Sequence, residues 1–385
     1  MLVSPAYPPP FIGGSSVYVY TLIENSNYNF GILTSKIPKN SDYLEITSKR
    51  QKIYRKSLIH FSVNPKKISL IISYIYQVFW IVWFRIKTKS PIVLTNGEVV
   101  LNSLIILLGK ILRFSVIPIS YAEEITTSLK GTGPKARLKS FLLKSSYPLA
   151  FRHISCCHFV RDILVDEINI SSTRTKVIPV AFSDEKIPNN GIRKISNNRY
   201  NILSVGRMVE RKGFIDLIQV VKKLKNDFPA LKLNIVGHGP LENDIQNIIK
   251  NQNLDKYIFF HGKVTDKALN ELYLESDLFV LAHRMLKNGD TEGSPITFAE
   301  AGLYKLPSIG GLNSGASTII NHKETGLIID TSNKAILYES IKNLFLDRKL
   351  MIKMGEKANL KILNEHSPEK IGKDFSLYLD KLLNL

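Results

Sequence analysis

The chain has 385 residues, of which 44% are hydrophobic and 22% are charged. This composition excludes an intrinsically disordered protein, because it provides enough apolar surface to offset the conformational entropy lost on folding. At roughly 100 to 200 residues per domain, the length predicts two domains, each with its own core. Lys and Arg (52) outnumber Asp and Glu (33), which gives a net charge of +19. That excess favours anionic partners such as nucleic acid, phospholipid headgroups or phosphorylated ligands, unless it is a general compositional bias.

Strand-like and helix-like runs alternate along the first half of the chain, as in α/β domains with parallel sheets. A first apolar run is only two residues long, Leu2 and Val3, which is short for a central strand. The further strands expected here are residues 31–34, 92–95, 115–120 and 177–180. The expected helices are residues 17–24, 68–86, 99–112 and 136–146.

One of these helices, over residues 68–84, is apolar and aromatic and has lysines and arginines on both sides. The segment is at the short limit for crossing a bilayer, and Ser69, Ser73 and Gln77 interrupt it. It is therefore expected to be a buried or partly membrane-facing helix. The chain opens without the pattern of a secretory signal, and its two cysteines are adjacent (Cys156, Cys157), so a reducing cytoplasm is the expected location.

Residues 182–199 lose apolar periodicity and are rich in Asn, Gly, Pro and charge, as linkers are. The alternation then restarts, with strands expected at residues 202–205, 231–236, 258–261, 278–282, 308–310 and 326–329. The closing stretch, residues 368–385, is amphipathic at helical spacing and needs a surface for its apolar face. The predicted fold is therefore α/β, with Rossmann-like domains over residues 1–190 and 191–367 and a terminal helix.

Gly13 and Gly14 follow a proline-rich turn and precede a helix. Glycine allows a ligand to approach the backbone closely, and the free N–H groups at a helix start attract anions or sugar oxygens. A purely structural turn explains the pair equally well.

Two glycine-containing loops follow strands of the second domain, where ligands of open α/β sheets bind. The first, GRMVERKG, carries Arg207 and Lys212, which offer a bidentate fork and a point charge to a diphosphate. The second, GHGPL, has Gly237 and Gly239 around one residue, which gives a low loop for a flat ligand. The alternative is two solvated cations and an ordinary turn.

The block at residues 290–311 holds two glutamates, Glu292 and Glu300, separated by seven residues. A helix beginning near Ser294 and Pro295 would place Glu292 at its mouth and Glu300 about two turns inside it. Its first amides could bind a phosphate or sugar hydroxyl, and each carboxylate could accept hydrogen bonds from paired hydroxyls. Two surface glutamates near a helix start are the alternative.

Taken together, GRMVERKG, GHGP, IFFHGKV, EGSPITFAEAG and HKETGLIID resemble the family 4 retaining glycosyltransferases of the GT-B fold. The resemblance covers most of residues 199–365, and in the first half it rests mainly on PPPFIGG. It implies two Rossmann-like domains that face each other across a cleft, the second binding a nucleotide diphosphate sugar and the first an acceptor. It also implies that the terminal helix returns to the first domain.

The resemblance implies roles for individual residues. Arg207 and Lys212 match the pair that neutralises the pyrophosphate without a metal ion, Glu292 matches the carboxylate facing the donor sugar, and Glu300 matches the one that holds the ribose. Further donor contacts are expected at Gly13, Gly14, Gly206, Gly237, Gly239, Lys263, Val264, Gly293, Ser294, Ile296 and Thr297. Neither a cofactor nor a metal ion is expected, and the histidines lack metal-ligand spacing.

The sequence departs from the family where many members carry a His-Gly-acid pattern near the reacting sugar. Here the matching stretch has Tyr121 and Ala122, followed by Glu123 and Glu124. Either Tyr121 or one of the two carboxylates replaces the missing contact, or the activity is altered. Glu123 or Glu124 is expected to enter the acceptor cleft as a catalytic group. The alternative is a helix start that favours acidic residues.

The sequence therefore predicts a retaining glycosyltransferase that transfers a sugar from a nucleotide diphosphate sugar to a lipid-linked or polysaccharide acceptor. Such a reaction would belong to the biosynthesis of lipopolysaccharide or another cell-surface polysaccharide. The alternatives are a nucleotide-sugar epimerase and an inactive homologue that only binds. Residues 1–190 hold 24 Lys and Arg against 11 Asp and Glu, whereas residues 191–385 hold 28 against 22. This asymmetry favours an anionic membrane surface under the first domain and disfavours nucleic acid, for which no basic and aromatic motif is present.

Overall fold

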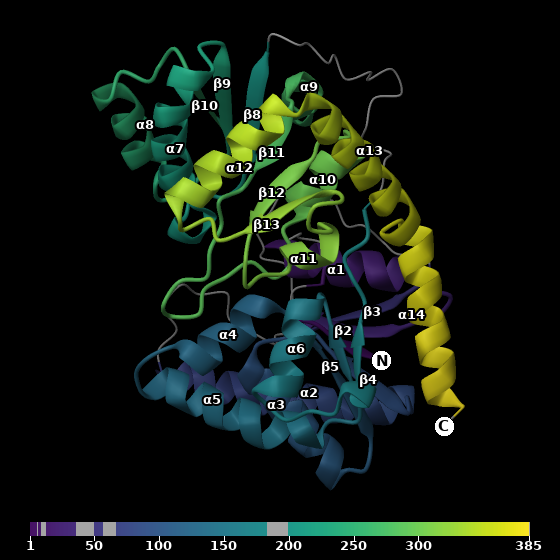
Figure 1. Ribbon diagram of the computed structural model, residues 1–385. Helices are drawn as coiled ribbons and strands as arrows, with labels where there is room; N and C mark the ends of the chain where they lie inside the picture. The colour runs from purple at the N-terminus through teal and green to yellow at the C-terminus, as the bar shows by residue number, and fades with distance from the viewer. Residues whose placement is uncertain (6, 9–12, 36–49, 57–66, 183–198, 385) are drawn as a thin grey trace. The chain divides into compact units, whose positions relative to one another are not determined.

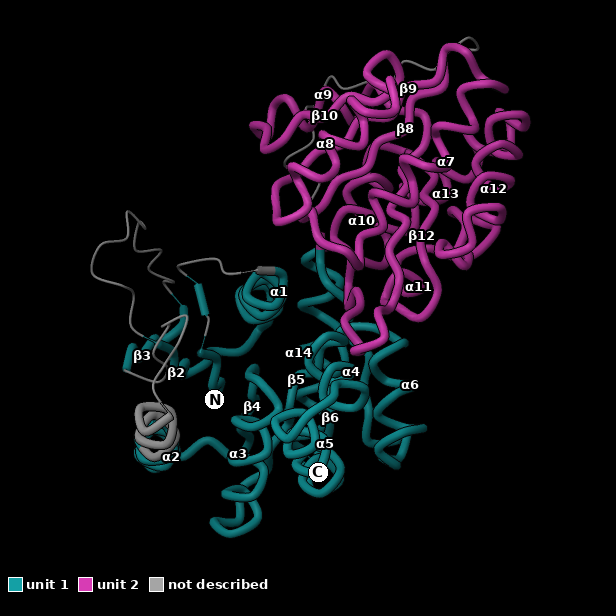
Figure 2. The backbone as a smooth tube through the Cα atoms, turned by 90° about the vertical axis from the view of Figure 1, so that its left-hand side faces the viewer, with its two compact units in different colours: residues 1–181, 368–385 teal, residues 182–367 magenta. Residues whose placement is uncertain are grey.

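The computed structural model describes the chain except for residues 6, 9–12, 36–49, 57–66, 183–198 and 385. It divides into two compact units (Figure 2). Unit 1 comprises Met1–Ala181 together with Pro368–Leu385, and unit 2 comprises Phe182–Ser367. The division falls after Ala181, nine residues before the expected boundary at residue 190, and most of the predicted linker lies outside the described residues.

Unit 1 is built on a parallel sheet with the strand order β3-β2-β1-β4-β5-β6-β7 (Figure 1). Its strands are β1 (Leu2–Val3), β2 (Gly31–Ser35), β3 (Lys52–Lys56), β4 (Ile92–Thr95), β5 (Ser115–Ser120), β6 (His153–Ser155) and β7 (Thr175–Val177). Its helices are α1 (Gly13–Glu24), α2 (Lys67–Thr88), α3 (Val99–Ile111), α4 (Ala122–Lys130), α5 (Pro134–Ser146), α6 (His158–Asp166) and α14 (Pro368–Leu383). Two 3₁₀ turns, η1 (Tyr147–Leu149) and η2 (Ser172–Arg174), precede β6 and β7.

The sequence located β2, β4 and β5 but was wrong about the strand at residues 177–180, since β7 covers Thr175–Val177 instead. It also missed β3 and β6, because KIYRK is highly charged and HIS is only three residues long. The short β1 is confirmed and lies between β2 and β4. Met1 lengthens its ladder, since the Leu94 amide donates to the Met1 carbonyl oxygen at 2.8 Å.

Helix α2 has two different faces, as expected for a partly buried helix. Ile81 and Phe84 are buried against the unit, whereas Tyr76, Phe79 and Ile86 are 56%, 58% and 69% exposed. Among the described helices, none combines the length and apolarity that a bilayer span requires.

The amphipathic end of the chain, α14, packs onto unit 1. Phe375 stacks on Phe30 with 6.1 Å between the ring centroids, and the Asn27 amide donates to the Ser376 hydroxyl at 2.9 Å. Gly372 allows the close approach, because a Cβ atom there would lie 1.9 Å from the Asn25 carbonyl oxygen. Unit 1 therefore supplies the surface that the apolar face of this helix requires.

Unit 2 is built on a second parallel sheet, with the order β10-β9-β8-β11-β12-β13. Its strands are β8 (Tyr200–Val205), β9 (Leu231–Val236), β10 (Ile258–Gly262), β11 (Leu278–Val280), β12 (Ser308–Gly311) and β13 (Gly326–Ile329). Its helices are α7 (Phe214–Asp227), α8 (Glu242–Asn251), α9 (Asp266–Glu275), α10 (Ile296–Leu303), α11 (Ala316–Ile319), α12 (Lys334–Leu346) and α13 (Arg348–Glu365), with a 3₁₀ turn η3 (Glu210–Lys212). All six strands match predicted ones within two residues.

Both sheets reverse their strand order once. In unit 2 the chain runs outward from β8 through β9 to β10 and then returns to the other side of β8 at β11. In unit 1 the reversal lies between β1 and β4. Ligands of open α/β sheets bind beside such reversals, at the carboxyl ends of the strands.

Candidate functional site

A buried ion pair joins the two loops that flank the strand reversal of unit 2. Lys212 follows β8, Glu292 follows β11, and their side chains meet with 3.0 Å between Nζ and Oε2. Lys212 is 8% exposed and Glu292 is 7% exposed. Buried charges are rare without a partner, and this pair lies at the position where the fold predicts a ligand site.

Two more charged side chains extend this pair. The Arg211 Nε donates to Glu292 Oε1 at 2.6 Å, and an Arg211 guanidinium nitrogen lies 3.6 Å from an Asp290 carboxylate oxygen. Burial alone would raise the pKa of Glu292, but the Lys212 and Arg211 cations outweigh it and lower this pKa to about 2. Glu292 is therefore a fixed anion at neutral pH. Sequence reasoning missed Arg211, because the family pattern pointed to Arg207.

Backbone geometry holds Lys212 in place. Gly213 caps the turn η3 with a φ of 68° and opens α7. A Cβ atom at Gly213 would lie 1.9 Å from the Ala282 carbonyl oxygen, so the loop after β8 packs directly on the chain after β11. A Cβ atom at Gly206 would lie 3.4 Å from the Lys212 side chain, which therefore runs close along this glycine.

Gly237 and Gly239 pack against the loop after β8. A Cβ atom at Gly237, where φ is 140°, would lie 1.9 Å from the Gly206 carbonyl oxygen, and one at Gly239 would lie 2.7 Å from the Met208 carbonyl oxygen. Amide hydrogen bonds join the same loops, from Met208 to the His238 carbonyl at 3.1 Å and from Leu241 to the Met208 carbonyl at 3.0 Å. The two glycines thus have a close-packing role, which the sequence did not predict.

Arg207 differs from its predicted partner Lys212. It is exposed, and the described part of the chain offers it no ion pair. The surroundings of the two cations therefore differ: Lys212 is buried against Glu292, whereas Arg207 is open to solvent.

His283, three residues beyond the end of β11, is a further residue of this site, for which the sequence predicted no role. It is fully buried, and its Nε2 lies 2.7 Å from the Ser314 hydroxyl. Burial lowers the pKa of His283 to about 4, and the Lys212 charge adds to this, although Glu292 opposes it. The imidazole is therefore neutral at pH 7. Its position immediately after the strand predicted at residues 278–282 was the only available signal.

The segment around Glu292 is braced by the loop after β12. The Gly315 amide donates to the Glu292 carbonyl at 2.9 Å, and the Thr291 hydroxyl donates to the Asn313 carbonyl at 3.0 Å. These two bonds fix the backbone on either side of the buried carboxylate.

Helix α10 begins at Ile296, one or two residues later than predicted, and Glu300 is only its fifth residue. Glu300 therefore lies just over one turn inside the helix, and Glu292 is buried in the preceding loop. Gly293, Ser294 and Pro295 form the approach to the helix, and the first amides, of Ile296 and Thr297, have no acceptor within it. The Thr297 hydroxyl oxygen is buried, and no hydrogen-bond partner for it is found among the described residues.

Glu300 is held by an aromatic residue from the preceding helix. The Tyr273 hydroxyl donates to Glu300 Oε2 at 2.9 Å. Burial raises the pKa of Tyr273 well above 10, so this hydroxyl keeps its proton. The rings of Tyr273 and Tyr304 stack with their centroids 4.9 Å apart, and the Tyr304 hydroxyl donates to Asn270 at 2.7 Å.

Lys263 and Val264 lie where the sequence placed them, in the loop after β10, Lys263 exposed and Val264 half-buried. His261 lies within the edge strand β10, where its Nε2 is 2.9 Å from an Asn234 side-chain oxygen. Partial burial lowers the pKa of His261. The Gly237 amide donates to the Gly262 carbonyl at 2.9 Å, which joins this loop to the one after β9.

In unit 1, the predicted residues lie near the carboxyl ends of β1 and β5. Gly13 and Gly14 open α1 beyond β1, next to the strand reversal, and Tyr121 follows β5 as the cap of α4. The Tyr121 hydroxyl donates to the Ser15 carbonyl at 3.3 Å, so it ties the two segments together. Glu123 is exposed in the first turn of α4.

Glu124 turns back onto its own helix start. Its Oε1 accepts a hydrogen bond from the Tyr121 amide at 3.2 Å, which forms a capping box. Burial raises the pKa of Glu124 to about 8, although the Tyr121 hydrogen bond opposes the rise. This is the alternative that the sequence allowed, a helix start that favours an acid, and the structure adds a carboxyl group that is largely protonated at neutral pH.

Exchanging Glu124 for glutamine tests this protonation. A carboxyl group whose pKa is raised on folding stabilises the fold below its unfolded pKa, near 4.5, and this contribution is lost as the pH rises through about 8. The wild type should therefore lose stability relative to Glu124→Gln between pH 6 and pH 9.5, by on the order of 1 kcal/mol per pH unit up to about pH 8 and by little more above it. Urea unfolding at both pH values measures this, with the exposed Glu123→Gln as the control. Parallel changes in all three proteins would contradict it.

No three His, Cys, Asp or Glu side chains within the described ranges lie close enough together to hold a metal ion.

Residues 186–361 match the family of group 1 glycosyl transferases. A curated relative is the GDP-mannose-dependent alpha-(1-6)-phosphatidylinositol monomannoside mannosyltransferase of Mycobacterium tuberculosis, 27% identical over 41% of this chain and 41% of that protein. The chain spans about half or less of the length of the curated relatives it matches.

Two solved structures share the whole fold. Sucrose-phosphate synthase from Thermosynechococcus elongatus superimposes with a TM-score of 0.79 at 18% identity, over 100% of this chain and 98% of that one. Anabaena HepE, solved in complex with UDP, superimposes with a TM-score of 0.74 at 14% identity, over 99% of both chains. With two parallel-sheet units and these superpositions, the chain has the GT-B fold, and its residues 186–361 match the group 1 glycosyl transferases.

Proposed function

We propose that the protein is a retaining, metal-independent glycosyltransferase that uses a nucleotide diphosphate sugar as donor. One observation carries the proposal: the buried Lys212–Glu292 pair lies at the strand reversal of unit 2, between a glycine loop and the start of α10. The GDP-dependent relative and the UDP complex of HepE support a nucleotide donor.

Charge balance indicates how a diphosphate would be bound. Lys212, Arg211, Glu292 and Asp290 together sum to zero charge, so attraction for a diphosphate must come mainly from the exposed Arg207 and from the amides at the start of α10. Lys212 has three N–H donors and gives one to Glu292, so it can bind phosphate oxygens while staying paired. Glu292 would then hold both the lysine and hydroxyls of the donor sugar.

Transfer of the sugar breaks the bond between its anomeric carbon and the diphosphate. The transition state resembles an oxocarbenium ion, and negative charge develops on the departing diphosphate. Lys212, Arg207 and the first amides of α10 would stabilise that charge, which is usually the largest catalytic contribution. Retention would follow if the acceptor hydroxyl attacks the face that the diphosphate leaves, with the diphosphate accepting the hydroxyl proton.

The acceptor would bind unit 1, near Gly13, Gly14 and Tyr121. Exposed Glu123 is free to contact an acceptor hydroxyl, whereas Glu124 is engaged with the Tyr121 amide. A lipid-linked or polysaccharide acceptor fits the relative whose name specifies a phosphatidylinositol mannoside. The basic excess of residues 1–190 supports a peripheral attachment of unit 1 to an anionic membrane on the cytoplasmic side.

Tyr273→Phe should weaken donor binding, because Glu300 loses the hydroxyl that fixes its carboxylate for the ribose. We expect the KM for the donor to rise about three- to tenfold, which corresponds to about 1 kcal/mol, the net worth of a typical hydrogen bond, with kcat within about twofold of the wild type. Steady-state kinetics with varied donor measures both constants. Tyr304→Phe is the matched control, since its hydroxyl bonds to Asn270; an equal rise in both variants would contradict the role of Tyr273.

A donor screen tests the function itself. The protein is incubated with a panel of nucleotide sugars, with and without candidate oligosaccharide acceptors, and the products are identified by mass spectrometry and the anomeric configuration by NMR. A new glycoside with the donor's anomeric configuration supports the proposal. Epimerised nucleotide sugar without acceptor would instead show an epimerase, and nucleotide binding without any turnover would show an inactive homologue.

A further inference from the structure

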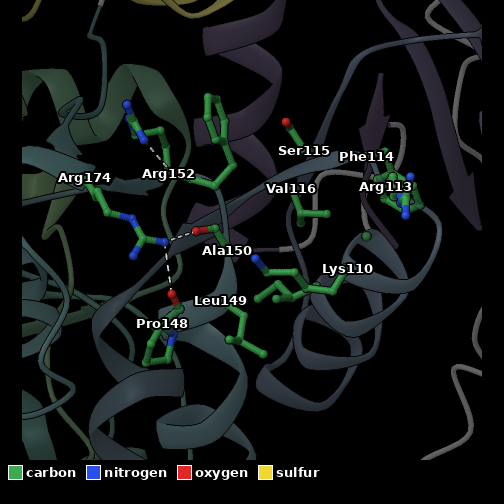
Figure 3. Close-up of a pocket in the computed structure, with 13 residues that line it drawn as sticks. Lys110, Arg113, Phe114, Ser115, Val116, Pro148, Leu149, Ala150, Arg152 and Arg174 are labelled. Atoms are coloured by element: carbon green, nitrogen blue, oxygen red, sulfur yellow. Dashed lines mark hydrogen bonds between the residues drawn. The ribbon is translucent and has the colours of Figure 1, made fainter.

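Unit 1 contains a pocket far from the residues discussed so far. Its cavity volume is about 630 Å³, and it opens where β5, β6 and β7 begin (Figure 3). Ser115 and Val116 start β5, Arg152 precedes β6, and Arg174 precedes β7. The predicted acceptor residues follow the carboxyl ends of the strands, so this pocket is at the opposite edge of the same sheet.

The pocket lining is cationic. Four of its thirteen residues are Lys110, Arg113, Arg152 and Arg174, and none is Asp or Glu. Lys110 and Arg113 are exposed and form no ion pair with any residue in the described part of the chain. In Figure 3 the Lys110 side chain extends toward the middle of the pocket. Such a concentration of positive charge attracts an anion.

The two other cations shape the pocket. Arg174 donates to the carbonyl oxygens of Pro148, at 3.0 Å, and Ala150, which fixes the turn η1 that forms one wall (Figure 3). The Arg152 guanidinium lies 4.6 Å from the Phe151 ring and donates to the Phe151 carbonyl at 3.0 Å. These contacts hold their guanidinium groups at the wall without neutralising their charge.

Exposed apolar residues occur in the pocket lining and next to it in the chain. Leu149, which lines the pocket, is 41% exposed, and Ile111 and Leu112, between the lining residues Lys110 and Arg113 in the chain, are 74% and 48% exposed. A soluble anion would gain no binding energy from these apolar side chains. A lipid would, because cations beside exposed Leu and Ile side chains match the boundary between headgroups and acyl chains.

We propose that this pocket binds the phosphate headgroup of an anionic phospholipid. Lys110 and Arg113 contact the phosphate, the fixed arginines add positive charge behind it, and Ile111, Leu112 and Leu149 enter the upper acyl region. The inference rests on the membrane attachment proposed above and gives it a site. Strand β5 is six residues long, about 20 Å. The predicted acceptor residues lie at the other end of this strand, about 20 Å from the headgroups. A membrane-anchored acceptor that reaches them would therefore have to be a sugar chain extending well beyond the headgroups.

Vesicle flotation tests the site with matched charge changes. The wild type is mixed with vesicles of phosphatidylcholine alone and of phosphatidylcholine with phosphatidylglycerol, beside Lys110→Glu/Arg113→Glu and the control Lys135→Glu/Arg137→Glu. Both pairs are exposed on unit 1 and change the net charge equally. We expect partitioning onto the phosphatidylglycerol vesicles to fall at least about tenfold in the pocket variant and by less than about threefold in the control.

Three results would overturn the proposal. Equal losses in both variants would show diffuse charge attraction without a pocket, and unchanged flotation of the pocket variant would show that the attachment is elsewhere. Stabilisation of the wild type by inorganic phosphate in a thermal shift assay, without flotation, would show a soluble anion as the ligand. Titration of the same variants with UDP and GDP, without vesicles, shows separately whether the donor unit is intact.

Discussion

Replacing Lys212 by methionine should lower kcat for sugar transfer about 100- to 1,000-fold, the usual cost of removing one preorganised charge from a transition state. Methionine preserves the length and packing of the side chain but removes the charge that holds Glu292 and the departing diphosphate. Glu292 retains Arg211 at 2.6 Å, so we expect the fold to persist with reduced stability. Steady-state kinetics and circular dichroism measure the two effects.

The control for this variant is Lys223→Met. Lys223 is an exposed cation on α7, the helix that begins just after Lys212. It should retain turnover within about twofold of the wild type, as exposed substitutions away from a site usually do. Glu292→Gln should lose activity as Lys212→Met does, because it removes the other half of the pair. Wild-type turnover in both Lys212→Met and Glu292→Gln would refute the assignment of the site.

The second large effect is expected for Gly213→Ala. The added Cβ atom would lie 1.9 Å from the Ala282 carbonyl oxygen, so the loops after β8 and β11 must separate. We expect a loss of about 3 to 5 kcal/mol in the free energy of unfolding, together with loss of donor binding because Lys212 is displaced. Urea unfolding followed by circular dichroism measures the first effect.

Gly262→Ala separates backbone strain from overlap. Gly262 has a φ of 62°, close to the 68° of Gly213, but its nearest neighbour to an added Cβ atom is 3.9 Å away. Its cost should be only the left-handed conformation, about 1 to 2 kcal/mol. If the two variants lose the same stability, the packing of the two loops does not constrain Lys212.

Four strands of unit 2, β8, β9, β11 and β12, were predictable because they are largely buried and rich in apolar residues, and the parallel pattern followed from the alternation of strands with helices. In unit 1, the edge strand β3 was missed because its five residues include three cations, and an edge strand needs no apolar run. Strand β7 was predicted two or three residues too late in the chain. The apolar run Val177–Val180 indicated a strand, but only its first residue pairs in the sheet.

The sequence motifs located the candidate site residues along the chain, but they did not predict which of these residues form ion pairs with one another. In the sequence, Arg207 and Lys212 are two cations of one loop with nothing to distinguish them. Only the folded loop shows that Lys212 is buried against Glu292 and that Arg211 binds the same carboxylate. The contacts between His283 and Ser314, and between Gly237 and Gly206, join segments far apart in the chain. Spacing along one sequence contains no information on such contacts.

Calorimetric titration with UDP and GDP tests the central claim, that Lys212 and Arg207 at the strand reversal of unit 2 bind the donor diphosphate. The wild type, Lys212→Met, Arg207→Gln and the control Lys223→Met are titrated with both nucleotides. We predict that at least one nucleotide binds the wild type and the control with the same Kd and binds each of the other two variants at least about tenfold more weakly. A Kd unchanged in Lys212→Met and Arg207→Gln would contradict the claim.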